Sequence, residues 1–201
     1  YGVSFNGYTA NLTGNYSYIG GGIFNLGLPD IPYIGYGIGP ITTAGSTVSL
    51  NYVSVDSNSA VIAGGGIANL MGDVTGYNTY INRNTAGKYG GGVMNIGKYY
   101  NAAQYGTLNL TYSTVDENSA TGKYPYSGSG GGIANLGGEA NVLYTTTNSN
   151  NAAYNGGGVI NGGKYGTPYN QTGTFNADLS EIRGNNAANN GGGIANMNYG
   201  T

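Results

Sequence analysis

Six copies of one short motif recur along the chain. Each copy has three glycines, an isoleucine or valine, one variable residue and an asparagine. The copies occupy residues 20–25, 64–69, 90–95, 130–135, 156–161 and 191–196. Self-similarity at intervals of about 20 to 50 residues is typical of a solenoid, in which each repeat packs against its neighbours. The repeat therefore constrains the architecture more strongly than any other feature of the sequence.

Apolar residues form further columns when the copies are aligned on their glycines. The segment before each glycine run alternates apolar and polar residues, which is typical of a half-buried strand. We predict that four columns form the core, namely Phe5, Val48, Val74, Leu108, Ala140 and Phe175; Gly7, Leu50, Gly76, Leu110, Val142 and Ala177; Leu12, Val55, Ile81, Val115, Thr147 and Ile182; and Ile23, Ile67, Val93, Ile133, Val159 and Ile194.

The spacing of the motifs sets the length of one coil. Their final asparagines are separated by 44, 26, 40, 26 and 35 residues, so the basic unit is 26 residues. This length fits three short strands separated by corners, and the six-residue period of a left-handed hexapeptide helix is missing. We predict an all-β fold, a right-handed parallel β-helix of about six coils. Residues 1–201 then form a single repeat domain, either complete or a segment of a longer chain.

Four insertions interrupt the regular unit, near residues 26–47, 96–107, 119–129 and 162–174. They contain all five prolines of the chain. Insertions confined to particular corners of a solenoid often mark its interaction side, and tyrosine suits a contact surface. The alternative is that these loops only cover the edges of the coils. The candidate contact residues are Tyr33, Tyr36, Tyr99, Tyr100, Tyr105, Tyr124, Tyr126, Tyr165 and Tyr169.

Asparagine fills two further columns. A side-chain amide both donates and accepts hydrogen bonds, so stacked asparagines can satisfy one another and the backbone of a turn. We prefer this structural interpretation to metal binding by the amide oxygens. The predicted ladders are Asn25, Asn69, Asn95, Asn135, Asn161 and Asn196, and Asn15, Asn58, Asn84, Asn118, Asn150 and Asn185.

Composition argues against several functions. A net charge of −2 with six basic residues gives no electrostatic footprint for nucleic acid, and no apolar run is long enough for membrane insertion. The sequence has no histidine and no cysteine, and its carboxylates are few. Asp56 and Asp116 hold equivalent positions two coils apart, with Asn82 between them, which favours a solvated turn column over a catalytic pair. We predict no enzyme activity, no catalytic residue, no cofactor and no metal.

Four N-x-S/T sequons occur in the chain. Chance matches are expected where asparagine and threonine are abundant, but an exposed sequon can carry a glycan. Asn170 lies in an insertion and is the strongest candidate, and Asn109 alternates with predicted core residues. The glycosylation candidates are Asn11, Asn15, Asn109 and Asn170.

The unit seen most clearly in Thr107–Asn135 (TLNLTYSTVDENSA…GGGIAN) resembles a known type of repeat. It is similar to the repeats of bacterial and archaeal β-helix surface proteins, which include adhesin-like and polymorphic outer membrane protein families. The resemblance implies an extracellular or cell-surface location and a passive structural or adhesive role.

Three functions follow as hypotheses. The first is a structural or adhesive β-helix that stacks end to end into a filament or continues into a longer repeat chain. The second is a monomeric adhesin module that binds surface glycans through its loop tyrosines. The third and most remote is a polysaccharide-cleaving β-helix enzyme.

Overall fold

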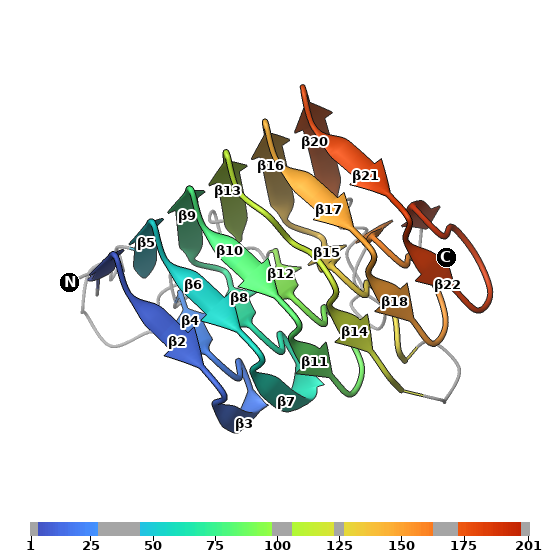
Figure 1. Cartoon of the computed structure of the whole chain (residues 1–201), viewed down its shortest axis with the longest axis horizontal. Helices are drawn as coiled ribbons and strands as arrows, with labels where there is room; N and C mark the ends of the chain where they lie inside the picture. Colours follow the sequence, from blue (N-terminus) through green and yellow to red (C-terminus); the bar gives the residue numbers. More distant parts are fainter. Residues whose placement is uncertain (1–3, 28–44, 98–105, 123–126, 163–172, 198–201) are drawn as a thin grey trace, which may run out of the picture.

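The chain folds into a parallel β-helix, as the repeat predicts. The computed structural model describes residues 4–27, 45–97, 106–122, 127–162 and 173–197. Within these ranges every regular element is a β-strand, and the paired strands run parallel in four stacked arrays along one axis (Figure 1). The predicted fold class, an all-β parallel β-helix, is confirmed.

Five of the six described coils contain four strand segments, and in the fourth coil isolated bridges at Thr114 take the place of the sheet B strand, so the prediction of three strands per coil is wrong. The first coil comprises β1 (Ser4–Tyr8), β2 (Asn11–Thr13), β3 (Tyr16–Ile19) and β4 (Ile23–Leu26), after which β5 (Thr47–Asn51) pairs with β1. The additional corner separates β1 from β2 and their equivalents. It contains neither Gly nor Pro in the first two coils, where Thr9 and Tyr52 adopt positive φ angles of 48° and 55°. A turn made by such residues carries no ordinary turn signal in the sequence.

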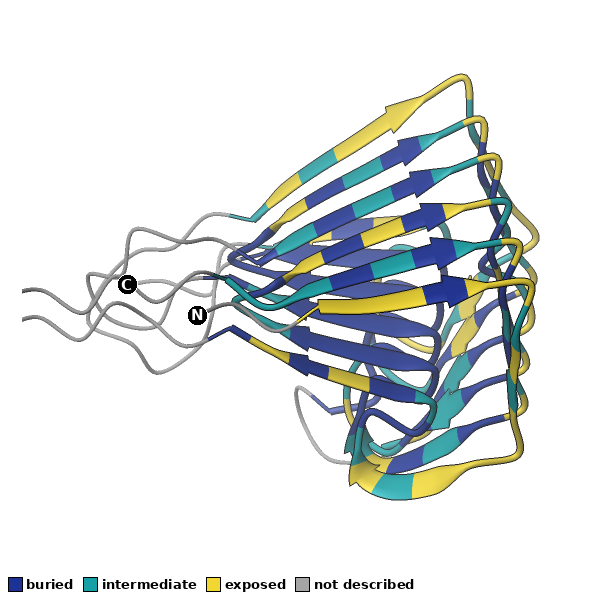
Figure 2. Ribbon diagram, turned by 90° about the vertical axis from the view of Figure 1, so that its left-hand side faces the viewer, coloured by how far each residue is buried: buried dark blue, intermediate teal, exposed yellow. Residues whose placement is uncertain are grey.

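Two arrays, sheets A and B, form adjacent faces of the solenoid that meet at one edge (Figure 2). Sheet B is divided into two parts, which are joined by single bridges from Tyr80 to Thr114 and from Thr114 to Thr146. Sheet A contains β1, β5, β9 (Asp73–Tyr77), β13 (Thr107–Thr111), β16 (Glu139–Leu143) and β20 (Thr174–Asp178). Sheet B contains β2, β6 (Ser54–Asp56) and β10 (Tyr80–Asn82), and then β17 (Thr146–Asn148) and β21 (Glu181–Arg183).

Sheets C and D complete each coil. The predicted insertions at 26–47, 96–107 and 162–174 all join a strand of sheet D to the next strand of sheet A, and the insertion at 119–129 lies between sheets C and D. Sheet C contains β3, β7 (Ser59–Ala63), β11 (Thr85–Ala86), β14 (Ser119–Ala120), β18 (Asn151–Ala152) and β22 (Asn186–Ala187). Sheet D contains β4, β8 (Ile67–Leu70), β12 (Val93–Ile96), β15 (Ile133–Leu136), β19 (Val159–Gly162) and β23 (Ile194–Met197).

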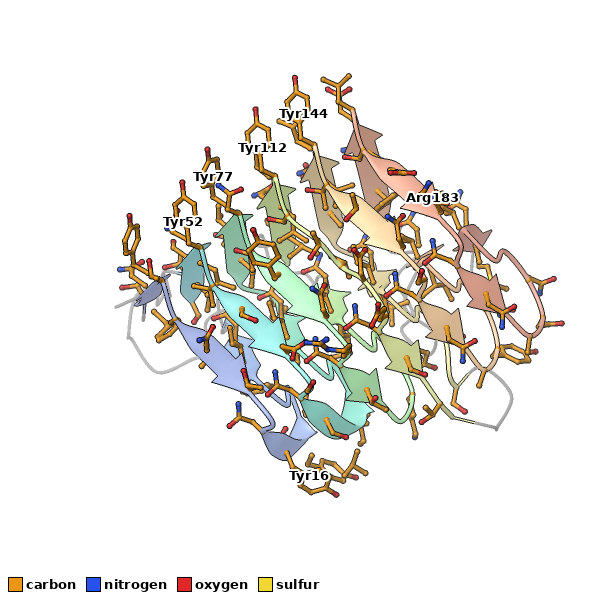
Figure 3. All side chains as sticks on the ribbon, viewed as in Figure 1. Tyr16, Tyr52, Tyr77, Tyr112, Tyr144 and Arg183 are labelled. Carbon is orange, nitrogen blue, oxygen red and sulfur yellow. The ribbon has the colours of Figure 1, made fainter. Side chains whose placement is uncertain are left out.

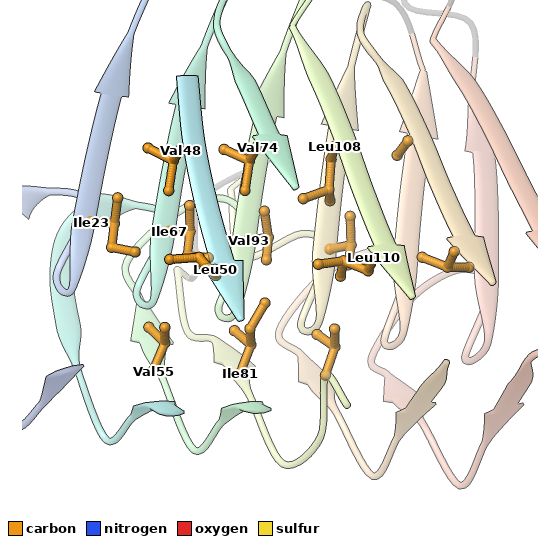
Figure 4. Packing of buried hydrophobic residues seen from close by; sticks show 14 of the residues in the cluster. Ile23, Val48, Leu50, Val55, Ile67, Val74, Ile81, Val93, Leu108 and Leu110 are labelled. Carbon is orange, nitrogen blue, oxygen red and sulfur yellow. The ribbon is translucent and has the colours of Figure 1, made fainter. Parts of the chain in front are cut away.

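The predicted apolar columns point into the solenoid. Val48 pairs in register with Val74, and Val74 pairs with Leu108, so like side chains stack from coil to coil (Figure 4). In the central coils these side chains are almost completely buried. Burial of a large aliphatic side chain contributes about 1.5–3 kcal/mol, so the shared columns are the main source of stability.

The four inner strands of sheet D, β8, β12, β15 and β19, are buried on both faces. Ala68 and Met94 point away from the main core, yet they are buried in a second cluster with Ala63. Tyr89 packs against the same cluster, and burial raises the pKa of its phenol. The connection from sheet C to sheet D therefore covers the outer face of sheet D, whereas the ends of the sheet A strands reach solvent (Figure 2).

The glycine run meets two different steric demands at this connection. Gly90 has a φ of +62°, and the first glycine of every other copy has a similar value. Left-handed backbone of this kind costs glycine the least. At the second position, a Cβ on Gly91 would collide with the backbone of Gly131 and Ser119 in the next coil. The glycines of the motif are therefore needed both for a sharp corner and for a close approach between coils.

Candidate functional site: an exposed tyrosine ladder

The loop tyrosines predicted as a contact surface lie outside the described residues. The same is true of Asn170, the sequon in the fourth insertion. The candidate surface must therefore be built from side chains that the repeat itself places. The nine residues concerned are Tyr33, Tyr36, Tyr99, Tyr100, Tyr105, Tyr124, Tyr126, Tyr165 and Tyr169.

Five other tyrosines, which the sequence analysis missed, form a continuous row on the edge where sheet A turns into sheet B. Four of the rings, which are labelled in Figure 3, project outward side by side along the solenoid axis, and the ring of Tyr8 contacts that of Tyr52. Each remains 39% to 74% exposed, although each ring contacts at least one other. This row, here called the tyrosine ladder, consists of Tyr8, Tyr52, Tyr77, Tyr112 and Tyr144.

The ring geometry changes along the ladder. The first three pairs are edge-to-face, with centroids 6.1, 5.9 and 5.7 Å apart and interplanar angles of 73° to 82°. The last pair, Tyr112 and Tyr144, is stacked, with centroids 4.9 Å apart and an interplanar angle of 4°. Both arrangements suit the quadrupole of an aromatic ring, and each pair contributes about 0.5–1.5 kcal/mol beyond area burial.

The ladder is continuous in space although its residues do not share one sequence column. Tyr8 and Tyr77 are the last residues of β1 and β9, whereas Tyr52, Tyr112 and Tyr144 follow one residue after β5, β13 and β16. In strand register, Tyr77 pairs with Asn51 and Thr111, the residues before Tyr52 and Tyr112. A search for a tyrosine at either of the two adjacent columns would have found the ladder.

Three of the ladder tyrosines have a backbone conformation that is unfavourable for a bulky residue. Tyr52, Tyr112 and Tyr144 have φ angles of 55°, 50° and 48°. A non-glycine residue in the left-handed region costs of the order of 1–3 kcal/mol, and such strain is concentrated at functional sites. Asn78, at the equivalent corner of the third coil, shows that a residue better suited to this conformation is accepted there. Thr9 and Leu179 have positive φ angles at the same corner of the first and last described coils, so the left-handed backbone belongs to the corner, and three of the ladder rings are displayed from it.

The asparagine columns lie inside the solenoid as two chains of side-chain amides. Each Nδ2 donates to the Oδ1 of the asparagine in the next coil, at 2.7–3.1 Å. The Nδ2 of Asn118 also donates to the carbonyl of Ile81, and its Oδ1 also accepts from the backbone N–H of Asn84. These bonds satisfy backbone groups at corners that neighbouring strands do not reach.

The polar column on sheet B uses its carboxylates in structural contacts. Asp56 forms two bonds with Arg83, at 2.9 and 2.8 Å, and this guanidinium lowers the pKa of the Asp56 carboxyl. Asp116 accepts the backbone N–H of Asn148 at 2.8 Å. Asn82 accepts the backbone N–H of Asp116 in the same way. The carboxylates of Asp56 and Asp116, which the sequence analysis considered as a pair, therefore form hydrogen bonds with different groups.

Three of the four sequons lie on described strands or corners. Asn11 is exposed on β2, and Asn15 is exposed at the first position of an amide column, where its Nδ2 donates to Asn58. Asn109 points outward from sheet A but is half-buried, and its Oδ1 accepts a bond from Asn141. The Nδ2 of Asn176 extends this outer row to the Oδ1 of Asn141. Asn11 and Asn15 are thus exposed, and Asn109 is the only half-buried residue of the three.

Comparison with known proteins assigns no relative to the chain. No family model, curated protein or solved structure matches it. Among the described residues, no group of three or more acidic, histidine or cysteine side chains could hold a metal ion. The same residues include no helix long and apolar enough to cross a membrane. The tyrosine ladder is a row of exposed side chains that continues through five successive coils of the described part of the chain.

The ladder offers a particular kind of chemistry. It presents flat aromatic faces and phenol hydroxyl groups in one line, on a scaffold fixed by strand pairing. Tyrosine provides a large contact area with few torsions to immobilise, so such a surface binds with a small loss of conformational entropy. A linear partner would meet several rings in succession.

Proposed function

We propose that the chain is a non-catalytic, extracellular structural and adhesive β-helix. On this proposal it is a cell-surface protein of the adhesin-like or polymorphic outer membrane protein type, and the tyrosine ladder is its contact surface. The observation that carries the proposal is that exposed tyrosine rings of successive coils contact one another although the tyrosines occupy two different sequence columns. Core packing alone does not require this arrangement.

The partner favoured by the ladder is a surface glycan. Sugar rings present apolar faces edged with hydroxyl groups, and tyrosine combines an apolar ring with a polar tip. Several rings in a line would bind successive sugars, so a modest affinity per ring would be multiplied along the chain. This version of the glycan hypothesis replaces loop tyrosines with tyrosines of the coil.

An array of immobilised neutral and acidic polysaccharides tests the proposal. We expect the purified chain to bind at least one polysaccharide, and the double variant Tyr52→Ser/Tyr112→Ser to bind about tenfold more weakly, because two anchors of the row are lost. Tyr80→Ser is the matched control, since Tyr80 is 47% exposed and lies outside the ladder. Absence of binding to every polysaccharide, or an equal loss in the control, would contradict the proposal.

End-to-end stacking is a second candidate function, and a different observation favours it. Phe5 is 45% exposed in the first described coil and Ile194 is 46% exposed in the last, although central residues of their columns are at or near 0%. Further coils of a longer chain or a second copy would cover these positions. Heterologous contacts between copies would propagate into a fibre.

Electron microscopy at increasing protein concentration distinguishes stacking from the ladder proposal. Filaments that disappear in Ile194→Asp and persist in Tyr80→Ser would support stacking, because only the first variant places a charge on the end of the core. Discrete particles at every concentration would overturn it. Polysaccharide binding by those particles would leave the ladder proposal standing.

A further inference from the structure

The tyrosines of the ladder also have the arrangement needed for oxidative coupling. The sequence contains 21 tyrosines but no tryptophan and no cysteine. Electron loss from this chain therefore cannot end on an indole or a thiol, which compete with phenols for one-electron oxidants. Phenols that are both exposed and adjacent are then the preferred sites of radical coupling.

One pair in the ladder is best placed for this reaction. Tyr112 and Tyr144 are stacked with centroids 4.9 Å apart and planes 4° from parallel. They occupy the same corner position in adjacent coils, each directly after a sheet A strand. Their exposed fractions of 48% and 46% give an oxidant access to both rings. The other pairs are wider and cross at 73° to 82°, which turns an edge of one ring toward the face of the next.

Strand pairing holds the two backbones at a fixed distance. Thr111 pairs with Leu143 directly before the two tyrosines, and the backbone N–H of Tyr112 donates to the carbonyl of Leu143 at 3.0 Å. Neighbouring parallel strands lie about 4.8 Å apart. Coupling therefore requires only ring rotation, which is fast for exposed side chains.

We propose that Tyr112 and Tyr144 form a dityrosine cross-link when a one-electron oxidant, such as a haem peroxidase with hydrogen peroxide, acts on the protein. Each phenol loses one electron to the oxidant and one proton to water, which leaves two tyrosyl radicals. The radicals join through one ortho carbon of each ring, and the two ortho hydrogens move to the phenol oxygens as the rings regain aromaticity. The product has one new carbon–carbon bond and two hydrogen atoms fewer than the starting protein. The cross-link joins two successive coils covalently.

Peptide mapping of the oxidised full chain tests this assignment. Cleavage after lysine and arginine places Tyr112 in peptide 99–123 and Tyr144 in peptide 124–164, whereas Tyr8, Tyr52 and Tyr77 share peptide 1–83. Dilute protein treated with peroxidase should yield 99–123 joined to 124–164 as the main conjugate, two hydrogen masses below the sum. Fragment-ion sequencing should place the bond on Tyr112 and Tyr144.

Conservative variants separate this pair from other tyrosines in the same peptides. Tyr144→Phe keeps the ring and its packing but has no phenol, so we expect about tenfold less of the conjugate, because proximity drives the coupling. Tyr52→Phe is the matched control and should leave the yield unchanged. The proposal is overturned if Tyr144→Phe has no effect, if coupling occurs only between molecules, or if urea-unfolded protein gives the same conjugate in equal yield.

Discussion

The two buried asparagine columns keep one sequence position in every coil, whereas the tyrosine ladder changes position between coils. Inside the solenoid, Asn118 must reach both Ile81 and Asn150, so a shift of one residue would break several hydrogen bonds. Outside, Tyr77 precedes the corner and Tyr112 occupies it, yet their rings meet. The sequence position of a buried asparagine is constrained by the backbone groups to which its amide bonds. The sequence position of an exposed tyrosine can shift by one residue, provided that its ring still contacts the next ring.

The largest effect on stability should come from the second glycine of the repeat motif, where successive coils approach one another closely. Gly91→Ala is expected to lower the free energy of unfolding by about 4 kcal/mol, because its Cβ would collide with the backbone of Gly131. Urea unfolding followed by circular dichroism measures the change. Gly14→Ala is the control, since a Cβ there meets no atom within 4 Å and Ser57 occupies the equivalent corner with positive φ. Equal losses in the two variants would refute the steric explanation.

Removal of one amide should break the inner row locally. Asn118→Ala is expected to cost about 3 kcal/mol, since it leaves buried groups of Asn84 and Ile81 without partners. Asn185→Ala, in the half-buried last position of the column, should cost less because water can replace the amide. Hydrogen exchange would show the loss of protection in the adjacent coils, and an equal cost at both positions would argue against a cooperative buried row.

One position inside the core should gain stability when it is made apolar. The hydroxyl of Thr147 is buried and, within the described residues, has no hydrogen-bond partner. Thr147→Val should raise the free energy of unfolding by about 1 kcal/mol, because an unsatisfied polar group is removed without loss of volume.

Thr145→Val is the opposite control for this prediction. The Thr145 hydroxyl donates to the carbonyls of Leu110 and Leu143, at 3.2 and 3.0 Å, so its removal should destabilise the protein. Thermal unfolding of the two variants should give shifts of opposite sign. Shifts of the same sign would contradict the distinction between satisfied and unsatisfied hydroxyl groups.

The outer row should contribute little to stability. Tyr112→Asn loses ring contacts but relieves left-handed strain, and these two effects are each about 1 kcal/mol and opposite in sign. The urea midpoint should therefore hardly change, while polysaccharide binding is weakened and the 99–123 conjugate is lost. A large loss of stability would mean that the ladder is a structural element like the amide columns.

The smallest effect should come from the ion pair on sheet B. Arg83 lowers the pKa of Asp56, so the charged carboxylate stabilises the folded state above the ordinary aspartate value of 3.8. This contribution is lost as the pH falls through the lowered pKa, and it is reduced by salt because Arg83 is exposed. Asp56→Asn should flatten the acid limb of the stability profile slightly at low salt. An identical profile in the variant would show that the pair contributes nothing measurable.

The sequence was sufficient to predict the features whose residues occupy the same repeat position in every coil. Val74 and Leu108 were placed correctly because burial demands the same side of every coil. The corner at Tyr52 was missed because a left-handed tyrosine carries no turn signal, so four strands per coil were read as three. The ladder was missed for a related reason, since Tyr8 and Tyr52 fall in different columns and only the folded chain brings their rings to 6.1 Å.

The amide rows also give the solenoid a direction. In both columns each amide-to-amide bond runs from an Nδ2 to the Oδ1 of the asparagine in the coil that follows, from Asn15 to Asn185 and from Asn25 to Asn196. The two ends of the stack therefore differ, with amide acceptors facing outward at one end and amide donors at the other. A mate related by a two-fold axis would set like groups against like, whereas a unit added in the same orientation would continue both rows. Any extension of this solenoid is therefore expected to add units in the same orientation, head to tail.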